Sequence, residues 1–170
     1  MRRIFVGFSR PIKRIFPVYS WAIRAIEGTK FSHVYVRHET HYKIDIVYQA
    51  SGTQVNFTNG ALFFDKNESV REFPFDITDD AFEKYMTFAL SHAGKPYGAL
   101  QVLGIALYSL FGLKKNPFPS GQAAYVCSEL VGEILYEVGR FKYDRELFDR
   151  LTPKDLFEFC LKHSGEEARQ

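Results

Sequence analysis

The segments FSHVYVRH (residues 31–38) and YKIDIVYQA (residues 42–50) carry the pattern from which the rest of the fold follows. Both are rich in β-branched and aromatic residues that alternate in period two, which is typical of β-strands. The three residues between them, 39–41, suit a short hairpin. We therefore predict an antiparallel strand pair here, as part of a meandering sheet over residues 31–75.

The rest of the chain divides into further short strands and a series of helices. Turn chemistry at Asn59-Gly60 and at residues 65–68 separates short strand candidates, and from Asp79 the apolar period becomes helical. The expected strands outside the hairpin cover residues 4–9, 55–57, 61–64 and 70–75, and the expected helices cover residues 18–27, 79–93, 100–111, 124–138 and 152–163. This order predicts an α+β fold in which an antiparallel sheet packs against helices.

The composition is that of one globular domain. The chain has 170 residues, of which 46% are hydrophobic and 16% aromatic, enough for one core but short for two domains. We predict a single domain over residues 1–163 and a polar tail over residues 164–170 that frays. The 22 basic and 20 acidic residues leave a net charge of +2. That field is too weak to predict a nucleic-acid partner.

The cysteine count and the apolar segments limit which cellular compartment and which cofactors the sequence is compatible with. Two cysteines are too few for a disulfide framework, or for a structural zinc site without histidines at short spacing, so we expect no metal and no cofactor. Arg10 and the basic residues after it end the first apolar run too soon for a secretory signal. The apolar stretch 98–113 has 16 residues, against roughly 20 for a membrane span. We expect a cytoplasmic protein in which this stretch is a buried helix or one that lies on a membrane.

The two thiols have different settings. Cys160 lies in an apolar helical segment, where a small hydrophobic thiol is an ordinary core residue. Cys127 follows a Gly- and Pro-containing loop and opens a helix, where the positive helix end stabilises a thiolate. Position alone still favours a buried structural cysteine at Cys127, because a nucleophilic thiol also needs a base.

A candidate base is His33, inside the first hairpin strand. A lone histidine in a strand is more often structural than catalytic, but Gln49 follows it by 16 residues, late in the second strand. If the two strands pair antiparallel, Gln49 comes near His33 and can bond one ring nitrogen, which leaves the other nitrogen for a thiol. Gln49 would then have the orienting function in a Cys/His/polar triad.

Three motifs together resemble the circularly permuted branch of the NlpC/P60 superfamily of papain-like cysteine hydrolases. They are FSHVYV at residues 31–36, GKPY at residues 94–97 and YVCSELV at residues 125–131. The histidine motif precedes the cysteine motif, the reverse of papain and the order of a permuted chain. The resemblance covers about residues 30–135 and is closest to the YaeF/YiiX-like proteins of bacteria and phages.

The resemblance implies the functions of three residues. Cys127 is the expected nucleophile, His33 the general base, and Gln49 stands where relatives often carry Glu. Glutamine can orient an imidazole but cannot balance an imidazolium with a full charge, so the expected thiolate–imidazolium pair is less stabilised. His38, Glu39 and His41 are rival orienting residues, ranked lower because a hairpin turn would point them away from His33.

The chemistry that the resemblance implies is acyl transfer from an amide or ester bond, by a hydrolase or an acyltransferase. The expected substrates are peptide-like or lipid-like acyl compounds, and Tyr97, Tyr125 and Ser128 are the expected substrate-binding residues. Two alternatives stay open. One is a catalytically inactive scaffold used for binding or host interaction. The other is an enzyme or adaptor at a membrane surface, based on residues 98–113 and on an N-terminus in which basic and apolar residues alternate.

Overall fold

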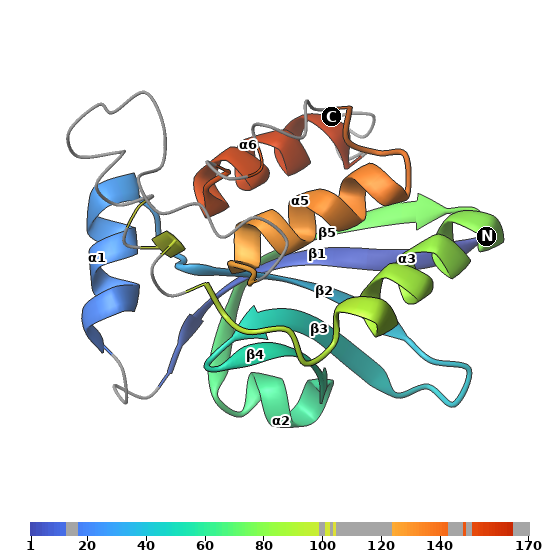
Figure 1. The fold of residues 1–170 in the computed structure, drawn as a ribbon, viewed down its shortest axis with the longest axis horizontal. Coiled ribbons are helices and arrows are strands. Elements are labelled where there is room, and N and C mark those ends of the chain that lie inside the picture. Colours follow the sequence, from blue (N-terminus) through green and yellow to red (C-terminus); the bar gives the residue numbers. More distant parts are fainter. Residues whose placement is uncertain are drawn as a thin grey trace.

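Five antiparallel strands form one sheet in the order β4-β3-β2-β1-β5 (Figure 1). They are β1 (Arg2–Pro11), β2 (His33–Glu39), β3 (Asp45–Ser51), β4 (Gln54–Asn59) and β5 (Asn67–Ile77). The structure is a computed structural model that describes residues 1–12, 17–98, 101–102, 104, 124–142, 148 and 151–164, with the backbone alone for 17–19, 21 and 22. The predicted α+β class is confirmed within this part of the chain.

The predicted hairpin is present as β2 and β3, and its pairing determines the shape of the site. Val36 pairs with Tyr48 and Glu39 with Asp45, and the β2/β3 ladder begins only at Val36. β2 pairs with β1 up to His33, whose partner there is Ser9. The first residues of β2 therefore have a strand neighbour on one side only. The last residues of β3, from Gln49 to Ser51, pair with β4 alone.

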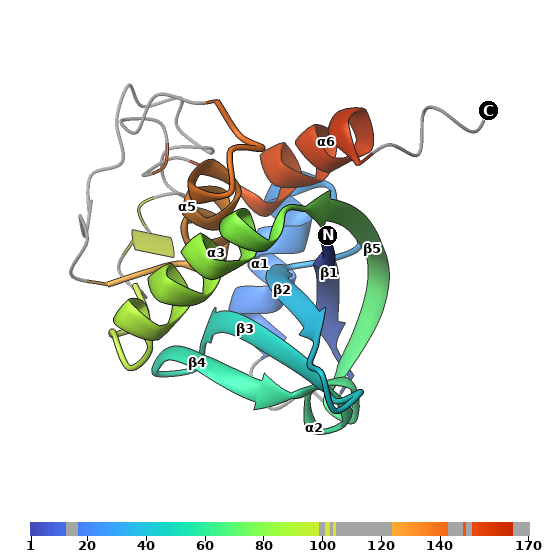
Figure 2. The ribbon, with the colours of Figure 1, turned by 90° about the vertical axis from the view of Figure 1, so that its right-hand side faces the viewer.

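The helices are α1 (Pro17–Glu27), α2 (Gly60–Phe64), α3 (Asp79–His92), α5 (Cys127–Glu137) and α6 (Pro153–His163). In Figures 1 and 2, α3, α5 and α6 lie over one face of the sheet, whereas α2 lies on the other side. Alternate strand residues such as Val6, Phe8 and Val34 form the core under α5, together with Leu130 and Ile134. This is the arrangement that the period-two pattern predicts.

The short segment predicted as a strand at residues 61–64 is instead the helix α2, so this prediction was wrong. The Asn59 side chain accepts a hydrogen bond from the Ala61 N–H at 2.9 Å and caps the helix. The helix places Phe63 against Tyr35 and Val47 in a second, smaller core. A run of four apolar residues is too short for its period to distinguish strand from helix, so capping and packing determine the outcome.

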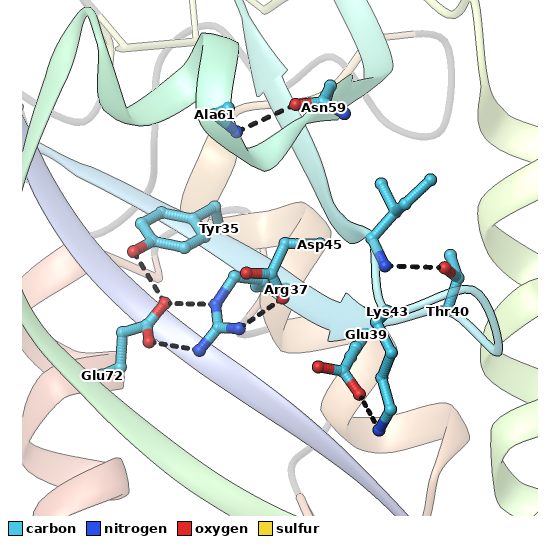
Figure 3. Close-up of polar contacts among 10 residues, drawn as sticks. Tyr35, Arg37, Glu39, Thr40, Lys43, Asp45, Asn59, Ala61 and Glu72 are labelled. Carbon is cyan, nitrogen blue, oxygen red and sulfur yellow. Dashed lines mark hydrogen bonds and ion pairs between the residues drawn. The ribbon is translucent and has the colours of Figure 1, made fainter.

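A polar network lies on the same face of the sheet as α2. Figure 3 shows Tyr35, Arg37 and Asp45 converging with Glu72. Arg37 contacts Glu72 through Nε and Nη2, at 2.9 and 2.6 Å, and Asp45 through Nη1 at 2.6 Å. The Tyr35 hydroxyl donates to Glu72 at 3.0 Å. Glu72 is on β5, so both β2 side chains cross β1 to reach it, and the Arg37 guanidinium lies over the Phe5 ring of β1.

Three of the predicted helices are observed nearly as predicted, among them the one at 18–27, which corresponds to α1, whereas other predicted elements lie outside the described residues. The predicted helices at 79–93 and 152–163 correspond to α3 and α6, and the one predicted at 124–138 begins at Cys127. Most of the predicted helix 100–111, most of the apolar stretch 98–113 and the tail residues 165–170 lie outside the described part of the chain. The extent of the domain stays a prediction.

Gly7 of β1 leaves room for the Tyr35 side chain, which extends from β2 across β1. Gly7 is the register partner of Tyr35, and a Cβ at this position would overlap the outer atoms of the Tyr35 ring. The ring contacts Phe63 of α2, with centroids 4.6 Å apart. Since Tyr35 is completely buried, its ring cannot move aside without disturbing this packing.

We therefore expect Gly7→Ala to lower the free energy of unfolding by about 1–3 kcal/mol, the usual cost of overpacking. Unfolding in urea of the wild type and the variant measures this difference in free energy. The control is the same substitution in a Tyr35→Ala background, where the overlap is absent and most of the cost should vanish. An equal cost in both backgrounds would contradict the steric explanation.

Candidate active site

The hydrogen bond expected between His33 and Gln49 is present. His33 Nε2 and Gln49 Oε1 are 2.8 Å apart. An amide oxygen only accepts, so Nε2 carries the proton and donates it. In the neutral ring this leaves Nδ1 with a lone pair and able to accept a proton.

Two residues of β4 orient the Gln49 amide. Its Nε2 donates to Thr58 Oγ1 at 3.3 Å and lies 3.5 Å from Asn56 Oδ1, and the Thr58 hydroxyl donates to Asn56 Oδ1 at 2.8 Å. These contacts give the NH₂ group of Gln49 its hydrogen-bond acceptors, so the amide oxygen points toward His33. Sequence reasoning missed Asn56 and Thr58, although their period-two spacing on β4 was a usable signal.

His33 and Gln49 border a cavity of about 590 Å³. Tyr97, which the sequence predicts to bind substrate, lines the same cavity. The other lining residues are mostly polar and uncharged, with some apolar residues and one cation; they are Pro11, Ser20, Ile23, Ser32, Ser51, Gly52, Gln54, Asn56, Phe57, Thr58, Leu62, Phe63, Lys66 and Asn67. Among the described residues, none of those that line the cavity carries a carboxylate. Such a wall suits a ligand rich in amide and hydroxyl groups.

Cys127 is the first residue of α5 and is 5% exposed. The backbone N–H groups of Val34, Cys127 and Ser128 lower the pKa of its thiol, as a helix start predicts, but burial outweighs them and raises this pKa to about 11. The thiol is therefore protonated at neutral pH. The thiolate that the helix end alone would favour is absent from this state of the protein.

The thiol and the imidazole are not joined by a hydrogen bond in the structure. The Cys127 sulfur lies by the Val34 N–H on the core face, whereas the His33 ring lies with Gln49 on the cavity face. Burial lowers the pKa of His33 to about 4, against the opposing effect of the Gln49 hydrogen bond. Both groups of the predicted pair are thus neutral at pH 7.

Two predicted substrate-binding residues lie elsewhere, which corrects the sequence-based expectation. Tyr125 is completely buried, and its hydroxyl donates to Glu133 at 3.1 Å. The buried Ser128 hydroxyl donates to the Leu151 carbonyl and ties α5 to the segment before α6. Neither side chain lines the cavity. They flank the cysteine in sequence, but the sequence does not tell which side of a helix start faces a ligand.

The rival orienting residues are not near His33. His38 is buried on the opposite face of the sheet, where its Nδ1 is 3.0 Å from the Tyr85 hydroxyl. Glu39 pairs with Lys43 at 2.8 Å, and His41 is exposed in the turn. The second thiol, Cys160, is completely buried in the core, as predicted.

The basic N-terminal residues in the described part of the chain are paired with carboxylates. Arg3 contacts Asp76 at 2.7 Å and Arg10 contacts Glu68 at 2.8 Å, both across the β1/β5 ladder. Arg2 contacts Asp79 at 3.3 Å. Lys13 and Arg14, the other basic residues of the expected membrane-binding segment, lie outside the described residues.

The described residues contain no helix with the length and apolarity that a bilayer crossing requires. Among the same residues, no three His, Cys, Asp or Glu side chains are grouped so that they could hold a metal ion.

Comparisons with known proteins yield a likeness of fold. No family model matches the chain, and no curated protein matches it. Among solved structures, the chain is similar to the metalloprotein YiiX from Escherichia coli O157:H7 (DUF1105), with a TM-score of 0.54 and 18% sequence identity over 81% of this chain. The match covers 64% of the YiiX chain, which is therefore substantially longer. YiiX belongs to the branch that the sequence motifs resemble, and the likeness supports the α+β fold.

The buried, protonated thiol makes a prediction about alkylation. We expect the rate at which iodoacetamide modifies Cys127 to rise about tenfold per pH unit between pH 8 and pH 10, because the thiolate fraction rises below a pKa of about 11. Mass spectrometry after proteolysis separates it from Cys160, which burial keeps protonated and should react far more slowly. A plateau already reached at pH 8, or equal rates for both thiols, would contradict this result.

Proposed function

We propose that this protein is a cysteine-dependent hydrolase or acyltransferase with a permuted papain-like fold. One observation carries the proposal: Gln49 bonds Nε2 of His33 and leaves Nδ1 as the proton acceptor, at the strand end against which the Cys127 helix start packs. The order of the motifs along the chain and the likeness to YiiX support the fold assignment.

In the proposed reaction, His33 Nδ1 takes the thiol proton and the Cys127 sulfur attacks the carbonyl carbon of the substrate. Backbone N–H groups at the start of α5 are suited to hold the oxyanion. The imidazolium then returns its proton to the leaving amine or alcohol, and a thioester remains on Cys127. Water, activated by the same imidazole, releases the acid, or another nucleophile accepts the acyl group.

The same geometry sets two requirements on this mechanism. The thiol does not line the cavity and lies on the other face of β2 from the His33 ring. Cys127 must therefore become uncovered, and the two side chains must come together, when the substrate enters. Since Gln49 is neutral, the imidazolium has no carboxylate partner at Nε2, and its formation depends on the thiolate and on the substrate complex. Both requirements predict slow turnover of any compound other than the natural substrate.

The cavity wall favours a polar substrate. Amide and hydroxyl side chains such as Gln54 and Ser51 can bond the peptide groups of an amide substrate, whereas a long acyl chain would leave them unpaired. We therefore propose a peptide-like amide, or an ester with a polar acyl group, rather than a lipid. The paired arginines of the N-terminus give the membrane-surface alternative no support.

A binding protein that keeps the scaffold without turnover is the second candidate. The observation that favours it is the neutral state of the site, with a buried thiol and no hydrogen bond between Cys127 and His33. The two candidates differ in one measurable respect: the enzyme forms a covalent acyl-enzyme on Cys127, and the binding protein does not.

The test uses p-nitrophenyl acetate as the probe and follows both p-nitrophenolate release and protein mass. We expect one acetyl group per chain on Cys127, none in Cys127→Ala, and a normal level in Cys160→Ser, which removes the core thiol. His33→Ala should lower the acylation rate by about 10²–10⁴-fold, the usual contribution of a general base. Acetylation that persists in Cys127→Ala, or none in the wild type over pH 6–9, would refute the proposal.

Gln49→Glu tests the orienting function. A carboxylate at this position should raise the pKa of His33, because an opposite charge favours the imidazolium. We expect faster acylation of Cys127 than in the wild type, whereas Gln49→Ala should be slower by about tenfold or more. NMR titration of His33 Cε1–H in both variants measures the pKa directly. Equal acylation rates in all three proteins would show that position 49 does not act through His33.

A further inference from the structure

The turn that leads from α2 into β5 forms one corner of the cavity beside His33. Four lining residues belong to this corner, which we call the α2 corner; they are Leu62, Phe63, Lys66 and Asn67. The α2 corner adjoins the candidate base, since the ring centroids of Phe63 and His33 are 6.3 Å apart. A group bound in the α2 corner is therefore close to the imidazole.

Hydrogen bonds fix the backbone of the α2 corner and leave the Lys66 ammonium for a ligand. The Lys66 N–H donates to the Phe63 carbonyl at 3.1 Å, and the Lys66 carbonyl accepts the Ile12 N–H at 2.9 Å. Among the described residues, no carboxylate forms an ion pair with the Lys66 ammonium. The Asn67 amide donates to the same Phe63 carbonyl at 3.0 Å, and its NH₂ group carries a second hydrogen that can bond a ligand.

The charges around the α2 corner favour an anion. Among the described residues that line the cavity, Lys66 is the only lysine or arginine and none is acidic. On the neighbouring strands, Arg10 and Glu68 neutralise each other through two contacts of 2.8 Å. Asp65 is exposed and does not line the cavity. The potential in this part of the cavity is therefore positive.

The other two side chains of the α2 corner are apolar. Leu62 is 63% exposed although it lines the cavity, whereas Phe63 is buried. An exposed leucine gains free energy when a ligand covers it with apolar surface. Leu62 and Lys66 together therefore suit a ligand in which a carboxylate lies close to an apolar side chain.

We propose that the α2 corner binds the terminal residue of the substrate, and that the substrate is a peptide-like amide with a free carboxylate on an apolar residue. The proposal rests on the proposed function and deepens it, because it names the end of the substrate that the cavity recognises. Lys66 and Asn67 bond the carboxylate, and Leu62 packs against the apolar side chain. The amide and hydroxyl side chains of β3 and β4 that line the same cavity are left for the peptide groups.

The experiment compares the binding of two probes that differ in charge, N-acetyl-leucine and N-acetyl-leucinamide, by NMR titration at low salt. We expect the wild type to bind the acid about threefold more tightly than the amide, or better, since an exposed ion pair contributes up to about fivefold. Added salt should reduce this preference. In Lys66→Gln the preference should vanish while the affinity for the amide stays the same. Leu62→Ala should weaken the binding of both probes and keep the preference.

The matched control is Lys162→Gln, which removes the same charge from an exposed position on α6, over the other face of the sheet (Figure 1). This variant should keep the wild-type preference. Equal affinities of the wild type for the two probes, a preference that persists in Lys66→Gln, an unchanged affinity in Leu62→Ala, or no binding of either probe would overturn the proposal. Binding needs no turnover, so a preference that depends on Lys66 in a protein that forms no acyl-enzyme would support the α2 corner and refute the proposed hydrolase.

Discussion

The contact between the start of α5 and the first residues of β2 is the constraint on which the rest of the site depends. β2 pairs with β1 up to His33 but with β3 only from Val36 on. The Val34 N–H contacts the Cys127 sulfur on one side of the strand, while on the other side the His33 ring bonds Gln49. One short strand segment thus contacts the thiol through the backbone N–H of Val34 and carries the imidazole on the side chain of His33.

The electrostatics of this site are those of a resting state without charges on the reacting groups. Burial outweighs three backbone N–H groups at the Cys127 sulfur and keeps the thiol protonated, and burial likewise keeps His33 neutral. Gln49 adds orientation without charge, and the carboxylate of Glu27, the last residue of α1, opposes the thiolate. Moving a proton from sulfur to imidazole in such surroundings creates two desolvated charges, so a substrate has to supply part of their stabilisation.

Residue patterns predicted much of this arrangement, and their failures have physical causes. The 16-residue spacing of His33 and Gln49 was enough to predict their hydrogen bond, because hairpin register follows from alternation and a short turn. The strand predicted at residues 61–64 was wrong, because the Asn59 cap and the burial of Phe63 favour a helix. Tyr125 and Ser128 flank Cys127 in sequence, yet their hydroxyls bond Glu133 and Leu151 in the interior.

The sequence by itself determined the α+β class, the hairpin, the unlike settings of the two thiols and the His33–Gln49 pair, because these depend on local period, capping chemistry and short spacing. Only the tertiary structure decided that the Cys127 thiol is protonated and covered, that His38 faces away from the site, and that the end of α1 meets the start of α6 through Glu27 and the Lys154 N–H. Burial and long-range electrostatics depend on which elements pack together. That information is distributed over the whole chain, and no single motif contains it.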